Sequence, residues 1–289
     1  MSVRTRAGIA AASVATLGLI SGGLAPAAVS DTAARMAPTP KLTVTLTKDG
    51  HTVDGPKTFK AGRVALEVKV RKRYGAVGVI KLKAGYTLKA AEQDLFSAFG
   101  PEPDLARLMK FNRKTTFFGG ISGARGTVRD GTIVLPRAGK YLIYDFGGPH
   151  FVRLATLNVT GPAVKRPVPH SDGLVVAKTD ARWGGSKTLP HKGTLTFKNA
   201  ATDSPHFLSM GRVARGTTRA QVLACIAEEG PCGFFRDESL DLEPLDEGKS
   251  MTVNYDLPRG TYVQLCFYPD HMTGAPHAAM GMVRIVTLK

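Results

Sequence analysis

Short segments of alternating apolar and polar residues dominate the chain. The alternation is clearest at residues 42–46, 64–70, 194–197 and 252–255. A period of two is typical of a β-strand with one buried face, because successive side chains point to opposite faces of the sheet. Glycine and proline separate these segments at short intervals. Many short strands with frequent turns predict an all-β fold, either a sandwich or a barrel.

Two segments have the period of an amphipathic helix instead. Residues 87–99 place Leu88, Ala91 and Leu95 on one face, and residues 217–228 place their apolar side chains in the same way. Such a stripe is typical of a helix that packs one face against a core. We therefore expect one short helix inserted among the strands of each half.

The two halves of the chain resemble each other. Residues 57–62 match residues 187–193, and residues 135–141 match residues 257–262. A repeat with a period near one domain length indicates a duplicated domain rather than a solenoid, whose periods are much shorter.

A proline-rich segment, residues 161–173, divides the halves and is typical of a stiff linker. It predicts two tandem β-sandwich domains, at residues 41–160 and 174–289.

Residues 1–30 have the features of a signal peptide. Arg4 and Arg6 precede a mostly apolar run at residues 7–24, and small residues follow at a cleavage region. The run is short for a bilayer span and rich in alanine and glycine, and no later run approaches a span. We expect an exported protein without a transmembrane segment, secreted or held in the cell envelope.

Sulfur and imidazole side chains gather near the C-terminus. Cys266, His271, His277 and Met282 follow one another between two apolar, strand-like segments. Another imidazole, His206, lies in a strand-like stretch upstream. Two histidines and one cysteine with a weak axial methionine form the ligand set of an electron-transfer copper centre, and soft sulfur donors disfavour magnesium, calcium and manganese. These residues predict a copper site.

The pattern resembles the cupredoxins, the plastocyanin-like Greek-key β-sandwiches with one early histidine and a late loop that carries cysteine, histidine and methionine. The resemblance implies His206, Cys266, His277 and Met282 as the ligands of one copper ion. The spacing from His277 to Met282 is the family's H-x4-M, whereas the spacing from Cys266 to His277 is longer than in most single-domain members. His271 is the rival for the second imidazole.

The duplication provides an internal comparison. Aligning the two halves places Asp145 where the second half has Cys266. The segment that should correspond to the region of His206, residues 74–79, contains no histidine. We therefore expect the first domain to bind no metal.

Three cysteines are present, and two of them lie close together. In an exported protein Cys225 and Cys232 are natural disulfide partners that close a short loop. Cys266 is then left over, and ligation to copper would explain why it stays reduced. Two alternatives remain open: Cys266 is a small buried apolar residue, or it forms a disulfide with Cys225 or Cys232.

The net charge of +16 is unevenly placed. From Ser171 onward the chain has as many acidic as basic residues, so the whole excess lies before that position. Arg71, Lys72 and Arg73 lie in its densest cluster. Export argues against nucleic acid as a specific partner, and an anionic cell-envelope polymer or a redox partner protein fits better.

No catalytic motif accompanies these features. The chain has no nucleophile elbow, zincin helix or phosphate-binding loop, and it lacks the paired histidines of a trinuclear oxidase centre. We expect no enzyme activity. The preferred function is an exported cupredoxin-like protein whose C-terminal domain binds one copper ion for one-electron transfer or copper handling. The alternative is a metal-free cell-envelope binding module that uses the basic first domain.

Overall fold

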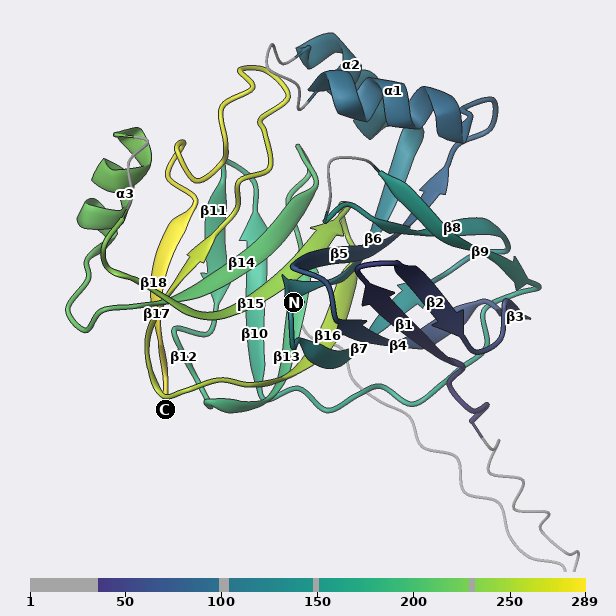
Figure 1. The fold of residues 1–289 in the computed structure, drawn as a ribbon, viewed down its shortest axis with the longest axis horizontal. Coiled ribbons are helices and arrows are strands. Elements are labelled where there is room, and N and C mark those ends of the chain that lie inside the picture. The colour runs from purple at the N-terminus through teal and green to yellow at the C-terminus, as the bar shows by residue number, and fades with distance from the viewer. Residues whose placement is uncertain (1–35, 99–103, 148–150, 229–231) are drawn as a thin grey trace, which may run out of the picture. The chain divides into compact units, whose positions relative to one another are not determined.

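The strands of the protein form two large sheets that face each other (Figure 1). The computed structural model describes residues 36–98, 104–147, 151–228 and 232–289. The expected signal peptide at residues 1–30 lies outside the described residues. Within the described ranges, no helix is both long and apolar enough to cross a bilayer.

The first half contains strands of both sheets and two helices. Its elements are β1 (Lys41–Thr47), β2 (Gly50–Asp54), β3 (Thr58–Lys60), β4 (Gly62–Val70), β5 (Tyr74–Leu82), α1 (Leu88–Ala98), α2 (Leu105–Lys114), β6 (Thr115–Ala124), β7 (Val128–Leu135), β8 (Gly139–Asp145) and β9 (Val152–Thr160).

The second half repeats this order with a single helix among its described residues. Its elements are β10 (Gly173–Lys178), β11 (Arg182–Gly185), β12 (Thr188–Leu189), β13 (Lys192–Asn199), β14 (His206–Val213), α3 (Arg219–Ala227), β15 (Phe235–Leu245), β16 (Ser250–Asp256), β17 (Gly260–Leu265) and β18 (Val283–Leu288).

Both sheets run through both halves, and the strand orders mirror each other. One sheet has the order β11-β10-β13-β16-β7-β4-β1-β2, and the other has the order β12-β18-β17-β14-β15-β6-β5-β8-β9-β3. The halves join where β16 pairs with β7, at Thr252 and Thr132, and where β15 pairs with β6, at Leu242 and Ile121. The division into domains at 41–160 and 174–289 therefore stays a prediction.

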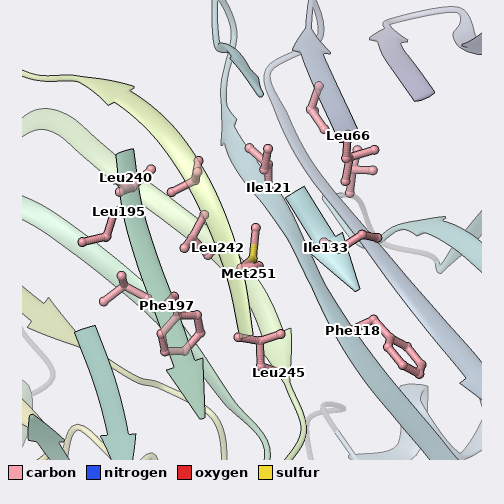
Figure 2. Packing of buried hydrophobic residues seen from close by; sticks show 14 of the residues in the cluster. Leu66, Phe118, Ile121, Ile133, Leu195, Phe197, Leu240, Leu242, Leu245 and Met251 are labelled. Atoms are coloured by element: carbon pink, nitrogen blue, oxygen red, sulfur yellow. The ribbon is translucent and has the colours of Figure 1, made fainter. Parts of the chain in front are cut away.

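One apolar core fills the space between the sheets (Figure 2). The strand β4 shows how the sequence builds it, because its residues alternate between buried and half-buried positions along the whole strand. Leu66 and Ile133 of the first half and Phe197 of the second are fully buried in the same cluster. The expected all-β sandwich fold is confirmed.

The helices agree with expectation in part. The expected segments 87–99 and 217–228 correspond to α1 and α3, and Thr218 caps α3 by accepting a hydrogen bond from the amide of Gln221. The expectation of one helix in the first half is wrong, because α2 follows α1. Its apolar residues Leu105, Leu108, Met109 and Phe111 recur at the spacing of an amphipathic helix, and Leu108 and Phe111 are buried, so the sequence does carry a signal for α2.

The proline-rich segment lies against the first half. Residues 161–172 contain no helix or strand, and Arg166 is 5% exposed. The guanidinium donates hydrogen bonds of 3.0–3.2 Å to the carbonyl oxygens of Pro38, Lys60 and Ala61. The linker role expected for residues 161–173 stays a prediction, and this anchor ties their start to the first half.

Candidate metal centre

Two neighbouring strands and one long loop bring together the side chains expected to bind copper. His206 begins β14, and Cys266 directly follows β17, which pairs with β14. His277 lies in the loop between β17 and β18. The loop folds back on the strand end, because the amide of Ala278 donates to the Cys266 carbonyl at 2.7 Å and the amide of His277 to the Tyr268 carbonyl at 3.0 Å.

The three side chains converge on one buried point. The Nδ1 atoms of His206 and His277 each lie 3.7 Å from the Sγ atom of Cys266. The two imidazole rings have centroids 4.6 Å apart. His206 and Cys266 are fully buried, and His277 is 3% exposed. The cluster therefore presents two nitrogen donors and one sulfur donor to the same small volume, shielded from water.

The distances fit a single metal ion. First-row metals such as zinc bond to sulfur at about 2.3 Å and to imidazole nitrogen at about 2.0 Å, so one ion can bridge a sulfur and a nitrogen up to about 4.3 Å apart. The Nε2 atom of His206 is buried without a hydrogen-bond partner, so no hydrogen bond from that atom orients the ring. The His206, Cys266 and His277 donor set supports one copper ion.

Burial keeps the three donors uncharged. It lowers the pKa of His206 to about 3, with a further contribution from the neighbouring His277, and it lowers the pKa of His277 as well. Burial raises the pKa of the Cys266 thiol to about 12, against the opposing effect of backbone amides at Phe207 and Tyr268. Neutral imidazoles offer their lone pairs to a metal, whereas the thiol must lose its proton when a metal binds.

Polar groups lie beside both histidines. The Oγ atom of Ser204 lies 3.4 Å from the Nε2 atom of His277, and a hydrogen-bond partner in such a position sets the tautomer and direction of a metal-binding imidazole. A carboxylate oxygen of Asp203 lies 3.9 Å from the Nε2 atom of His206, too far for a hydrogen bond, and acts on that ring through its charge alone. Neither residue figured in the sequence analysis, although both directly precede the Pro205–His206 pair.

The fourth expected ligand, Met282, is fully buried in the same core cluster as Cys266. Its amide donates to the His277 carbonyl at 2.9 Å, and its carbonyl accepts from the Trp183 indole at 2.9 Å. These bonds fix the backbone of Met282 at the end of the loop between β17 and β18, hereafter called the ligand loop. Its role as axial ligand stays a prediction.

The rival histidine lies apart from this cluster. The side chain of His271 is 35% exposed, and its Nδ1 atom lies 3.8 Å from a carboxylate oxygen of Asp270. In the part of the chain that the structure describes, the potential metal-binding group contains His277 and not His271. The geometry favours the longer spacing from Cys266.

The cysteines pair as expected. Cys225 and Cys232 form a disulfide with a Cα–Cα distance of 5.8 Å. Cys266 is a free, buried thiol. The alternative in which Cys266 forms a disulfide with Cys225 or Cys232 is therefore wrong.

The first half holds an ion pair where the second half holds the thiol. Asp145 ends β8 as Cys266 follows β17, and its carboxylate accepts hydrogen bonds of 2.9 Å from the amides of Ala76 and Gly147. The side chain of Lys72 forms an ion pair with it. The backbone thus offers Asp145 the same kind of amide contacts that Cys266 receives. The sequence alignment identified Asp145, whereas nothing in the sequence linked it to Lys72.

No protein-family model and no curated protein matches the chain. A dithionite-reduced auracyanin from the photosynthetic bacterium Roseiflexus castenholzii is 28% identical, covering 40% of this chain and 94% of its own, with a TM-score of 0.27. Auracyanin A from Chloroflexus aurantiacus, a "blue" copper protein, is 18% identical over 40% of this chain and 96% of its own, with a TM-score of 0.25.

Longer neighbours span both halves. The McoA multicopper oxidase from Aquifex aeolicus is 9% identical, covering 86% of this chain and 65% of its own, with a TM-score of 0.25. The copper assignment for this chain rests on the geometry of His206, Cys266 and His277.

Proposed function

We propose that the protein binds one copper ion through His206, Cys266 and His277, with Met282 as the axial ligand, and that the site transfers single electrons or handles copper. The observation that carries this proposal is the buried convergence of two Nδ1 atoms on one thiol sulfur at 3.7 Å. Copper in such a site supplies a one-electron change of oxidation state.

The chain contributes rigidity and exclusion of water. His206 begins β14 and Cys266 directly follows β17, and these two strands pair with each other in the interior of a sheet, so the positions of both residues should change little when the charge of the site changes. Burial of all three donors keeps water away from the site. A site that keeps its geometry needs little reorganisation for a one-electron step.

The ligand loop also offers a contact for a partner. Met272 is 72% exposed and Met280 is 48% exposed, and both lie on the loop that carries His277. Exposed thioethers form an adaptable apolar surface. This surface suits a redox partner protein that docks over the site.

The proposal extends to where the protein works. The features of residues 1–30 favour export, so the protein acts outside the cytoplasm or in the cell envelope. A disulfide in the second half agrees with an oxidising compartment. The proposed role is that of a carrier rather than an enzyme.

A copper titration tests the site. Cu(II) added to the purified protein should produce an intense visible thiolate band that saturates at one copper per chain. Cys266→Ser should remove this band, because no other free thiol lies in the described ranges. The matched control is the double variant Cys225→Ser with Cys232→Ser, which should keep the band. A colourless titration of the unaltered protein would contradict the proposal.

The charge distribution favours one alternative, a basic first half that binds anionic envelope polymers. All of the +16 net charge lies before Ser171. Lys72 forms an ion pair with Asp145, whereas Arg71 and Arg73 form none with another described residue. Replacing both arginines with glutamine should weaken salt-sensitive binding to an anionic polymer such as heparin. Equal binding by the variant would count against this alternative.

A further inference from the structure

A cavity of about 280 Å³ lies on the ten-stranded sheet, outside the copper cluster. Its floor comes from neighbouring strands of both halves: β5 and β6 of the first, and β14 and β15 of the second. Helices α1 and α2 and the start of the ligand loop enclose it. Figure 1 shows these helices and the yellow loop at the same end of the sheets, and Tyr268 of the loop donates a hydrogen bond to Asn112 of α2.

Aromatic side chains from both halves form its walls. The first half supplies Phe111, Phe117 and Tyr144, among others. The second half supplies Phe207 and Phe267. The ring of Phe267 is 43% exposed, so an aromatic residue lies at the opening. Aromatic rings thus line the cavity together with aliphatic side chains such as Ile80, Leu95 and Leu242.

A buried carboxyl group lines the cavity. Glu243 is 9% exposed and accepts hydrogen bonds from the hydroxyls of Ser122 and Tyr144. A second carboxyl, that of Asp241, also lines the cavity and accepts a hydrogen bond of 2.7 Å from Ser209. Polar groups therefore gather on the strand floor below the aromatic walls.

Within the described ranges no lysine or arginine forms an ion pair with Glu243, and Lys72 is paired with Asp145. Burial is the largest cause that raises the pKa of Glu243, and the charges of Asp145 and Asp241 raise it further, against the hydrogen bonds from Ser122 and Tyr144. Without a cation beside it the carboxyl therefore favours its protonated form, whereas a cation bound next to Glu243 would favour the carboxylate and gain it as a partner.

We propose that this cavity binds an organic ammonium ion, a cation with an apolar body, between the two halves of the chain. The aromatic faces attract a cation through their quadrupoles, and aromatic cages are a recurrent site for quaternary ammonium groups. Glu243 supplies the counter-charge at the floor. An anion would meet two carboxyl groups there, and a neutral ligand would gain no charge attraction from Glu243. The inference goes beyond the copper site and does not depend on it.

The test is a calorimetric titration of the full chain before any copper is added, so its result is separate from that of the copper titration. Choline is the probe, and its neutral isostere 3,3-dimethylbutan-1-ol is the matched ligand. We expect saturable binding of choline at one site and binding of the alcohol that is at least about tenfold weaker. Equal binding of the two ligands, or no binding of choline, would overturn the proposal.

Variants locate the site. Glu243→Gln should weaken the binding of choline at least about tenfold, because the amide keeps the shape of the side chain and removes its negative charge. The control on the same strand is Glu238→Gln. The carboxylate of Glu238 pairs with Arg212 outside the cavity, so its removal should leave the binding of choline unchanged.

A second pair of variants keeps the proposal testable if Glu243→Gln fails to fold. Phe267→Leu at the opening should weaken the binding of choline about threefold, because leucine removes a ring face and keeps an apolar side chain. Phe96→Leu is the control, since Phe96 is 65% exposed on α1 and does not line the cavity. Unchanged binding in the Phe267 variant would assign choline to another place and overturn the proposal.

Discussion

At the scale of the residue, the two halves place different side chains at matching positions, Cys266 in the second half and Asp145 in the first. In the second half Cys266, directly after β17, has a thiol that faces two imidazoles. In the first half Asp145, the last residue of β8, has a carboxylate that is paired with Lys72. Both groups lie among backbone amides, and both are almost fully buried. In both halves the backbone amides suit a hydrogen-bond acceptor. The side chains beside it differ: two imidazoles next to Cys266 favour a metal ion, whereas the Lys72 ammonium group neutralises Asp145.

Replacing Lys72 tests the ion pair. Lys72→Met should lower the free energy of unfolding by about 3 kcal/mol, because it leaves the carboxylate of Asp145 buried without its cation. The double variant with Asp145→Asn should recover part of the loss. Urea denaturation at pH 7 measures both. Lys69→Met is the control: its partly exposed pair with Glu67 should contribute less than about 1 kcal/mol, and an equal loss in both single variants would contradict the explanation.

At the scale of the element, the turn after β15 ties the second half to the first. A carboxylate oxygen of Asp246 accepts a hydrogen bond of 3.2 Å from the amide of Phe117, at the start of β6. Burial raises the pKa of Asp246 to about 6, although the hydrogen bond from Phe117 and the nearby Lys249 oppose that shift. This carboxyl therefore holds its proton more tightly in the folded protein than in the unfolded chain.

The pKa shift of Asp246 predicts a change of stability with pH. Its stabilising contribution is fully present below the unfolded pKa near 4 and is lost as the pH rises through about 6, which amounts to about 3 kcal/mol. Asp246→Asn should flatten this part of the profile and raise the free energy of unfolding at pH 7. Chemical denaturation at several pH values measures it. Its exposed neighbour provides the control Glu247→Gln, and a profile that Asp246→Asn leaves unchanged would disprove the assignment.

At the scale of the whole molecule, the two halves share both sheets and one core. Residues 36–289 form a single compact unit, and the buried cluster contains side chains from both halves (Figure 2). The pairings of β15 with β6 and of β16 with β7 cover strand edges that a separate half would expose. Exposed strand edges and apolar side chains favour aggregation.

Separating the halves tests their dependence. The segment 174–289 expressed alone should fail to give a stable monomer, because β15 and β16 lose their neighbours and Leu242 and Met251 lose part of their packing. Size-exclusion chromatography and thermal unfolding measure this, with the chain from residue 36 to 289 as the reference. A monomeric segment that unfolds cooperatively at the same temperature would show instead that the halves are independent.

Much of this protein followed from the sequence. The alternation of apolar and polar residues predicted the sandwich, because the period of two depends only on local backbone geometry. The order of His206, Cys266, His277 and Met282 predicted the copper site, because few ligand sets combine these donors. The short spacing of Cys225 and Cys232 predicted their disulfide, because chain connectivity alone keeps them close.

Tertiary structure decided the rest. The choice of His277 over His271 depended on how the loop folds back onto Cys266, which spacing along the chain does not determine. The Lys72–Asp145 pair, the sheets shared between the halves and the position of Glu243 at the aromatic cavity each join residues far apart in the sequence. Local patterns determine which face of a strand is buried, whereas only the packing of distant strands determines which side chains meet there.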